Sequence, residues 1–397
     1  MPDPATDERL TILLGCDTFA PDVNGAAKFA ERLAEGLIER GHRVVVVAPS
    51  DTGVPHEGVE THAGHAVFVY RLRSHRWPLH EWVRFIFPGA ARRGVARILD
   101  DVKPDAVHFQ SHFIVGRALS VEARSRGIRL IATNHTMPEN MLEFTGVPRF
   151  AWPVLLKWAW RDEGKVLGRA EAVTTPTRRA AEFLEEHTPI RDVHAISCGI
   201  HTTDYTPSFQ GARNTVLFVG RLAHEKCIDV LVRAFALLPE SLGARLEIVG
   251  KGEQRAELEK LVASLGLSDR VAFAGYVSDA DLPARYTAAS VLAMPSIAEL
   301  QSIVTMEAMA SGLPVVAADA MALPHLVHDG ENGYLFRPGD VVDLAAKLER
   351  VLTLPEAEFD AMKHASLRIV QSHDIERTVS TFEALYRGMP VTDPVTE

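Results

Sequence analysis

The sequence predicts an α/β protein of two domains, each built on a parallel sheet. Short apolar strands alternate with amphipathic helices along most of the chain, and strand–helix–strand units of this kind form parallel sheets. The chain has 397 residues, too many for one ordinary core and suited to two domains of roughly 200 residues each. A run over 199–214, rich in Thr, Ser, Pro and Gly, interrupts the alternation and predicts the domain boundary.

Composition narrows the class of protein. A hydrophobic content of 47% with 24% charged residues describes a soluble globular chain, and a net charge of -10 argues against a nucleic-acid partner. Cys16, Cys198 and Cys227 are scattered and lack metal-ligand spacing, which indicates a reducing compartment. No apolar run approaches the ~20 residues of a membrane span, and the polar N-terminus does not resemble a signal peptide. We therefore expect a cytoplasmic protein.

The first domain opens with a strand over 10–14, a loop, a helix over 26–40 and a strand over 44–48. Ligands of open parallel sheets bind at the carboxyl ends of strands, so Gly25 in this loop is a candidate for close approach to a ligand. An ordinary turn glycine is the alternative. A Gly-x-Gly-x-x-Gly dinucleotide fingerprint does not follow the strand.

A second candidate is His135, which follows the predicted strand over 130–133. Histidine at the carboxyl end of a parallel strand is well placed to meet a ligand, although it could equally form hydrogen bonds within its own loop. His108 and His112, at the end of a strand over 106–109, carry a weaker form of the same argument. Further strands are predicted over 172–175 and 193–197.

All five tryptophans lie in two segments that break the alternation, 71–93 and 149–161, where they are mixed with arginines. Tryptophan with basic residues is typical of the surface of an anionic membrane. Single-stranded nucleic acid would suit the mixture too, but the acidic net charge opposes it. Burial of the aromatics under ordinary helices is the remaining alternative. The candidates for membrane or acceptor contact are Trp77, Trp82, Arg84, Trp152 and Trp158.

In the second domain, a strand over 215–219 runs into Gly220, Arg221 and then Lys226, just before a helix over 228–238. Two cations beside a helix N-terminus suit a diphosphate, whereas a solvated surface pair is the plainer interpretation. The next strand, over 246–249, ends in a glycine-rich turn with Gly250 and Gly252.

A strand over 291–294 is followed by the loop Glu299-Leu300-Gln301-Ser302 and by a helix that carries Glu307. Free N–H groups at the start of a helix attract anions. Two carboxylates beside them could hold the hydroxyls of a sugar nucleotide, although solvated glutamates are the alternative. Because three consecutive strand ends offer phosphate- or sugar-binding chemistry on one sheet edge, we expect them to form one site.

With these residues in place, the chain resembles glycosyltransferase family 4, the retaining enzymes with the GT-B fold of two Rossmann-like domains facing across a cleft. The resemblance covers nearly the whole chain and is strongest over 217–336. The matching motifs are Glu-x7-Glu at Glu299 and Glu307, Gly220-Arg221-Leu222 with Lys226, Val249-Gly250 with Gly252, and Asp329-Gly330-Glu331-Asn332-Gly333-Tyr334.

The resemblance implies a role for each matching residue. Arg221 and Lys226 would neutralise the diphosphate leaving group, Glu299 would bind the hydroxyls of the donated sugar, and Glu307 those of the ribose. His135 would lie beside the sugar near the acceptor. Leu300, Gln301, Ser302, Gly220, Gly250 and Gly252 would line the donor site, and Gly25 would belong to a loop that closes on it. The donor would be a UDP- or GDP-sugar, with no cofactor and no metal.

The same resemblance implies the roles of the domains. Residues 1–199 would bind the acceptor, 200–373 the donor, and a last helix over about 374–388 would pack back on the first domain. The segments 133–140 and Glu299-Leu300-Gln301 look similar to members that glycosylate diacylglycerol-type lipids. A lipid acceptor would place the protein on the inner face of the plasma membrane. A soluble acceptor, such as inositol phosphate or a sugar phosphate, and a nucleotide-sugar epimerase of the same fold are the alternatives.

Three departures from the family pattern bear on the sugar pocket. The first loop has Asn24-Gly25-Ala26 in place of a glycine pair, and Cys227 stands in place of the glycine after the clamp lysine. Leu300-Gln301 replaces a common Phe-Gly. The backbone N–H groups remain available for the donor, while the shape of the sugar pocket differs.

Overall fold

The computed structural model describes residues 9–22, 24–62, 64–76, 84–139, 147–210 and 214–392. The chain divides into two compact units. Unit 1 comprises Met1–Gly199 and Ile375–Glu397, and unit 2 comprises Ile200–Asp374. Within the described ranges, no helix is both long enough and apolar enough to cross a membrane.

Unit 1 contains an eight-stranded sheet in the order β10-β9-β8-β7-β1-β2-β4-β3, in which only the β3–β4 pair is antiparallel. Its strands are β1 (Thr11–Gly15), β2 (Arg43–Pro49), β3 (His56–His62), β4 (His65–Leu72), β7 (Ala106–Phe109), β8 (Arg129–Thr133), β9 (Ala172–Thr175) and β10 (His194–Ala195). A separate small pair is formed by β5 (His75–Arg76) and β6 (Arg84–Phe85). The helices are α1 (Gly25–Glu39), α2 (Pro88–Val102), α3 (Ile114–Ser125), α5 (Trp152–Leu167), α6 (Arg178–His187) and α14 (Ile375–Arg387).

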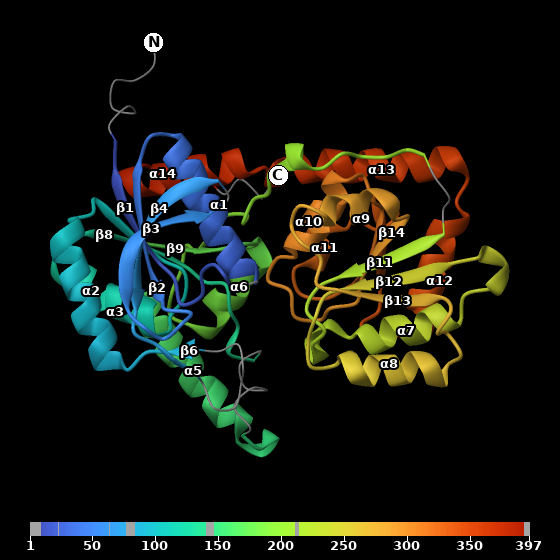
Figure 1. Cartoon of the computed structure of the whole chain (residues 1–397), viewed down its shortest axis with the longest axis horizontal. Helices are drawn as coiled ribbons and strands as arrows, with labels where there is room; N and C mark the ends of the chain where they lie inside the picture. Colours follow the sequence, from blue (N-terminus) through green and yellow to red (C-terminus); the bar gives the residue numbers. More distant parts are fainter. Residues whose placement is uncertain are drawn as a thin grey trace, which may run out of the picture. The chain divides into compact units, whose positions relative to one another are not determined.

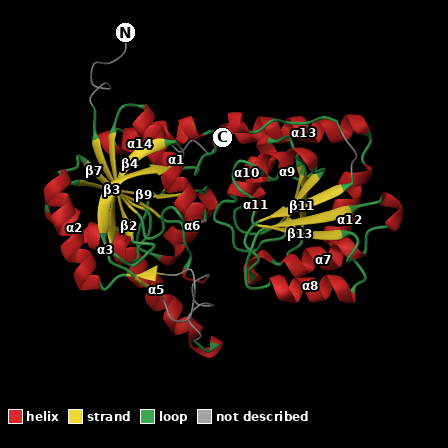
Figure 2. Cartoon of the chain, viewed as in Figure 1, coloured by secondary structure: helices red, strands yellow, loops and turns green. Residues whose placement is uncertain are grey.

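Unit 2 contains a six-stranded, wholly parallel sheet in the order β13-β12-β11-β14-β15-β16. Its strands are β11 (Thr215–Val219), β12 (Arg245–Val249), β13 (Val271–Gly275), β14 (Val291–Met294), β15 (Val315–Ala318) and β16 (Gly333–Phe336). The helices are α7 (Ile228–Ala236), α8 (Arg255–Ser264), α9 (Leu282–Ala288), α10 (Ile303–Ala310), α11 (Leu323–Leu326), α12 (Val341–Thr353) and α13 (Glu356–Val370). Figure 2 shows helices on both faces of this sheet.

Burial on both faces explains the composition of the central strands. Every residue of β14 and β15 is buried, and both strands are continuous apolar runs, as expected of parallel strands covered by helices on each side. The helices that cover them are amphipathic. On α7, for example, Ile228, Leu231 and Phe235 recur at three- and four-residue spacing and are fully buried. The predicted α/β class with two parallel-sheet domains is confirmed.

One element joins the two ends of the chain. Helix α14 follows unit 2 in sequence but belongs to unit 1, where it packs against α1 (Figure 1). Gly36 of α1 allows this close approach, because a Cβ there would lie 2.6 Å from Cγ2 of Val379. Arg40 of α1 adds charged hydrogen bonds to Glu376 at 2.7 Å and Glu383 at 3.1 Å. Unit 1 is therefore completed by the last helix of the chain.

Candidate active site

The carboxyl ends of β11 and β14 are neighbours in unit 2. The two strands pair directly, with Val216 opposite Val291 and Leu217 opposite Leu292. From β11 the chain first builds outward through β12 and β13, then returns to β14 on the other side of β11. Such a reversal of strand order opens a crevice at the carboxyl edge, where ligands of doubly wound sheets bind. The loops that follow β11 and β14 therefore define the candidate site.

Lys226 and Glu299 meet at this point. The Nζ atom of Lys226 donates a hydrogen bond to Oε1 of Glu299, and only 20% and 11% of the two side chains are exposed. The loop after β14 is anchored to the short 3-10 helix His224–Lys226 by the carbonyl of Glu225. That carbonyl accepts hydrogen bonds from the backbone N–H of Ile297 at 3.1 Å and from Oγ of Ser296 at 3.2 Å. The expected cation and sugar-binding carboxylate thus lie side by side.

Arg221 lies on the same loop, nearer the surface. Its guanidinium pairs with Oε1 of Glu225 at 2.6 Å, and 47% of its side chain is exposed. Glu225 holds two parts of the site together, since its side chain orients Arg221 and its backbone anchors the loop after β14. Glu225 was not identified from the sequence. Arg221 and Glu225 are four residues apart but do not lie on one α-helix, and the contact with Ser296 joins residues far apart in the chain.

Cys227, which follows the clamp lysine, has a φ of 48° and begins α7. This is the left-handed region that glycine enters without strain. Cys227 therefore adopts a backbone conformation that favours glycine, the residue that the family pattern has at this position.

Glu307 is buried on α10, the helix that follows the loop after β14. Only 6% of the residue is exposed, and Oε2 accepts a hydrogen bond at 3.0 Å from the hydroxyl of Tyr286, which is itself fully buried. Ser302 is the residue before α10, and its hydroxyl accepts from Oγ1 of Thr305 at 2.8 Å. The first N–H groups of a helix have no acceptor within it, so this end of α10 presents donors beside Glu299. Leu300 and Gln301 are half-buried between them.

Gly250 and Gly252 are required where two loops touch backbone to backbone. A Cβ on Gly250 would lie 1.9 Å from the carbonyl oxygen of Gly220, and one on Gly252 would lie 2.3 Å from that of Leu222. The contact is closed by a hydrogen bond from the N–H of Leu222 to the carbonyl of Lys251 at 2.9 Å. No side chain fits at either glycine, and the φ of 138° at Gly250 also favours glycine, so the local backbone explains both residues.

In unit 1, His135 lies at the carboxyl end of β8. Its Nε2 lies 2.8 Å from Oε1 of Gln110, which follows β7, and its ring packs on Phe29 of α1 with centroids 4.9 Å apart. Burial lowers the pKa of His135 to about 3, so the imidazole is neutral at pH 7. Gly25 is the first residue of α1 and is exposed, while Oδ1 of Asn24 caps the helix by accepting from the N–H of Ala27 at 2.9 Å.

The aromatic segments divide between core and surface. Trp160 is buried, and its indole N–H donates to Oε1 of Glu139 at 2.9 Å. Trp152 is half-buried and donates to the carbonyl of Val147 at 2.9 Å, whereas 67% of Trp158 is exposed. Arg84 is half-buried and donates to Oγ of Ser74 at 2.7 Å. The predicted contacts at Trp77 and Trp82 lie outside the described residues.

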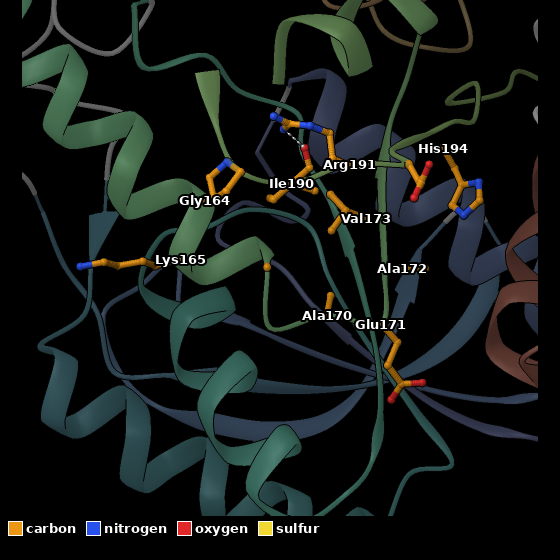
Figure 3. Close-up of a pocket in the computed structure, with 12 residues that line it drawn as sticks. Gly164, Lys165, Ala170, Glu171, Ala172, Val173, Ile190, Arg191 and His194 are labelled. Carbon is orange, nitrogen blue, oxygen red and sulfur yellow. Dashed lines mark hydrogen bonds between the residues drawn. The ribbon is translucent and has the colours of Figure 1, made fainter. Parts of the chain in front are cut away.

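A pocket of about 510 Å³ lies elsewhere in unit 1 (Figure 3). It is lined by the end of α5 around Gly164 and Lys165, by the first residues of β9 and β10, and by the segment 189–192. These are the amino ends of the strands, opposite the edge that holds His135. Arg191 is tied to backbone carbonyls there, including that of Ile190 at 2.6 Å. The pocket is therefore separate from the candidate site.

One group of possible metal ligands occurs among the residues that the structure describes. Glu35 and Glu39 of α1 and His65 of β4 bring ligand atoms within 4.8 Å of one another. Nε2 of His65 lies 3.5 Å from an oxygen of each carboxylate. The group belongs to unit 1.

Comparison with known families covers both units. A family model described as Glycosyltransferase Family 4 matches residues 23–204, and one described as Glycosyl transferases group 1 matches residues 206–368. A GDP-mannose-dependent alpha-mannosyltransferase of Mycolicibacterium smegmatis is 30% identical over 342 residues, which cover 82% of this chain and 84% of that protein.

Two other relatives are less similar in sequence. A sulfoquinovosyl transferase of Arabidopsis thaliana is 26% identical, over 87% of this chain and 66% of its own length. An alpha-monoglucosyldiacylglycerol synthase of Streptococcus pneumoniae is 24% identical, over 87% of this chain and 79% of its own length.

Solved structures share the fold over nearly the full chain. Sucrose-phosphate synthase from Thermosynechococcus elongatus superposes with a TM-score of 0.79 at 23% identity, covering 96% of this chain and 99% of that one. Anabaena HepE in complex with UDP gives 0.74 at 20% identity, covering 96% and 100%. The chain therefore belongs to glycosyltransferase family 4 and is a GT-B glycosyltransferase that transfers a sugar from a nucleotide sugar.

Proposed function

We propose that the chain is a retaining hexosyltransferase that uses a UDP- or GDP-sugar and transfers to a hydroxyl of a membrane lipid such as diacylglycerol. The observation that carries the donor half of this proposal is the pairing of Lys226 with Glu299 at the point where the strand order of unit 2 reverses. A cation suited to phosphate and a carboxylate suited to sugar hydroxyls lie in contact at one edge of the sheet, which matches the two chemical ends of a nucleotide sugar.

In the proposed mechanism, donor binding replaces the Lys226–Glu299 ion pair with two contacts to the donor. Lys226 and Arg221 turn to the diphosphate, and Glu299 accepts hydrogen bonds from the hydroxyls of the sugar. Glu307, held by Tyr286, binds the ribose. Because negative charge grows on the diphosphate as the glycosidic bond breaks, the two cations and the first turn of α10 stabilise the transition state more than the ground state.

Retention follows from attack on the face that the diphosphate leaves. The acceptor hydroxyl approaches beside the departing phosphate, and the sugar passes through a short-lived oxocarbenium-like ion. No carboxylate forms a covalent intermediate, so the two-carboxylate scheme of glycoside hydrolases does not apply to Glu299 and Glu307. The proposal assigns charge compensation to Arg221 and Lys226 and requires no metal. His135, which is neutral, contributes a hydrogen bond to the sugar rather than a charge.

The lipid acceptor is supported by exposed apolar residues on α5 and just before it. Val154 and Trp158 are four residues apart on α5 and so lie on one side of the helix, while Phe150 lies in the 3-10 helix Arg149–Ala151 that precedes α5. Phe150, Val154 and Trp158 are 87%, 75% and 67% exposed. Lys157, Arg161 and Lys165 are exposed beside and beyond them. Figure 1 shows α5 extending away from the sheet of unit 1. An apolar stripe with lysine and arginine suits the surface of an anionic bilayer.

The acceptor is tested with vesicles. We expect the protein to co-sediment with vesicles containing an anionic phospholipid, and Phe150→Ser with Trp158→Ser to lose this binding. Val59→Ser is the matched control, since Val59 is 67% exposed on β3 of the same unit. If the unaltered protein does not bind anionic vesicles, the proposal of a lipid acceptor is wrong. A soluble acceptor, inositol phosphate or a sugar phosphate, is then the proposed one.

The donor is tested by thermal shift with UDP, GDP and their sugars, because a ligand of the native state raises its stability. The expected result is a higher melting temperature with one of the two nucleotides, and a smaller shift after Lys226→Ala. Incubation with donor alone separates transfer from epimerisation. Conversion of the donor to its epimer without an acceptor would show the chain to be an epimerase of the same fold.

A further inference from the structure

A buried chain of hydrogen bonds crosses the sheet of unit 1 from α14. The hydroxyl of Tyr386 lies 2.7 Å from Nδ1 of His108 on β7, and Nε2 of His108 lies 2.6 Å from Oγ1 of Thr133 on β8. Oγ1 of Thr133 lies 2.7 Å from Oγ1 of Thr174 on β9. All four residues are buried. These hydrogen bonds therefore link α14 to the three adjacent strands β7, β8 and β9 in the buried interior of unit 1.

A row of aromatic rings runs beside this chain. Phe382 of α14 stacks on His108 with ring centroids 4.9 Å apart and planes 27° apart. Phe382 also contacts Phe29 of α1 at 5.6 Å, and Phe29 packs on His135 at 4.9 Å. One ring therefore separates α14 from the histidine of the proposed acceptor side.

The polar groups provide a second connection to His135. Gln110, which lies 2.8 Å from Nε2 of His135, follows His108 by two residues at the end of β7. Thr133 precedes His135 by two residues at the end of β8. The two segments that hold His135 thus start at His108 and at Thr133. These two residues are within hydrogen-bond distance of each other, and His108 is also within hydrogen-bond distance of Tyr386. The imidazole is held at its ring face by Phe29 and at one nitrogen by Gln110.

We infer that Tyr386 and Phe382 are positioning residues, which set the orientation of His135 from the helix that closes unit 1. The functional importance of that orientation rests on the proposed role of His135 beside the donated sugar. Helix α14 begins at Ile375, directly after Asp374, whose Oδ2 accepts from Oγ1 of Thr202 at 2.6 Å in unit 2. The helix that supports the histidine is therefore the covalent continuation of the donor unit.

The inference is tested with Tyr386→Phe, which removes one oxygen and keeps the ring. In the intact protein, burial lowers the pKa of both His108 and His135 to about 3, so each should give the nitrogen spectrum of one neutral tautomer near pH 7. With ¹⁵N-labelled histidine, we expect the variant to shift the side-chain resonances of both. We expect kcat for transfer to fall about tenfold, as for a misplaced contact, with the KM for the donor within twofold.

Leu385→Ala is the matched control. Leu385 is a buried neighbour on α14, and its truncation should lower the melting temperature without moving the histidine resonances or kcat. Unchanged His135 resonances in Tyr386→Phe would overturn the inference. An equal loss of kcat in Tyr386→Phe and Leu385→Ala, each measured below its melting temperature, would overturn it too. If Tyr386→Phe does not fold, Phe382→Leu tests the ring contact by the same readouts. A His135→Ala variant with full transfer activity would refute the proposed role of His135, while the resonances still decide the positioning.

Discussion

At the scale of single residues, the candidate site depends on charges that neutralise one another until the donor arrives. Lys226 and Glu299 are mostly buried, and each compensates the other, since a partly buried charge without a partner is costly. The sequence identified both residues from their places after predicted strands, and the resemblance implied their roles, but their direct contact depends on β14 lying next to β11. Tyr286 and Gln110, which hold Glu307 and His135, could not be identified from sequence because each acts through one distant hydrogen bond.

The first prediction concerns the donor clamp. Lys226→Ala or Glu307→Ala should lower kcat/KM for the donor by about 10²-fold or more, the scale of losing a charged group that faces the reacting centre. Initial rates at varied donor concentration measure this. Lys260→Ala is the control, because Lys260 is exposed on α8 and should leave the rate unchanged. Full activity in a folded Lys226→Ala protein would remove Lys226 from the site.

The second prediction concerns pH. His108 and His135 are buried with their pKa lowered to about 3 by desolvation, whereas an unfolded histidine titrates near 6.5. The unfolded state therefore binds more protons, so their contribution to stability is complete above pH 6.5 and is lost as the pH falls towards 3. Urea unfolding at pH 7, 6 and 5 should show this decline. In His108→Gln the free energy of unfolding should fall less steeply as the pH is lowered. An equal fall in the variant and the unaltered protein would contradict the lowered pKa of His108.

At the scale of elements, strands and helices were predictable where periodicity or continuous apolar runs were strong. The bounds of β7, β9, β11 and β14 match the predicted strands. The β3–β4 pair was not predicted, because only alternate residues of these strands face the core and β3 is largely exposed. The predicted strand over 193–197 is only His194–Ala195, since the edge of the sheet offers β10 a single partner, β9. Sheet order could not be derived from sequence, as it depends on crossovers.

The third prediction tests the contact between the two loops at the β11 and β12 ends. Gly250→Ala should destabilise the protein by about 3 kcal/mol or more, because its Cβ would meet the carbonyl of Gly220 at 1.9 Å. Gly266→Ala is the control for a positive φ without a clash: its φ is 68°, against 138° at Gly250, and no atom lies within 4 Å of the added Cβ. It should cost about 1 kcal/mol. Equal losses in chemical denaturation would show that the close approach does not matter.

At the scale of the whole molecule, the site residues belong to two units that the chain completes in an unusual order. Unit 2 is one continuous segment, Ile200–Asp374, whereas unit 1 needs both Met1–Gly199 and the segment from Ile375 onward. The sequence alone indicated a boundary near 199 from its loss of periodicity. Only the resemblance suggested that α14 packs on unit 1, because the amphipathic pattern of a helix does not show which surface the helix packs against.

The fourth prediction follows from this division. A chain that ends at Asp374 should keep unit 2 folded and lose the cooperative unfolding of unit 1, because Val379, Phe382 and Tyr386 would no longer cover α1 and β7. Limited proteolysis should then leave a fragment near 200–374 and digest 1–199. Survival of 1–199 at the rate seen in the full chain would show that α14 is not required for that core.

The placement of α14 also has a consequence during synthesis on the ribosome. The first half of the chain emerges early but lacks its closing helix until translation has passed Arg387, so unit 2 can fold while unit 1 is still open. Meanwhile the surface around Phe29 and Gly36 is without its cover, and nascent protein would offer it to chaperones. Stalling or premature termination before Ile375 would thus release chains with a complete unit 2 and an incomplete unit 1.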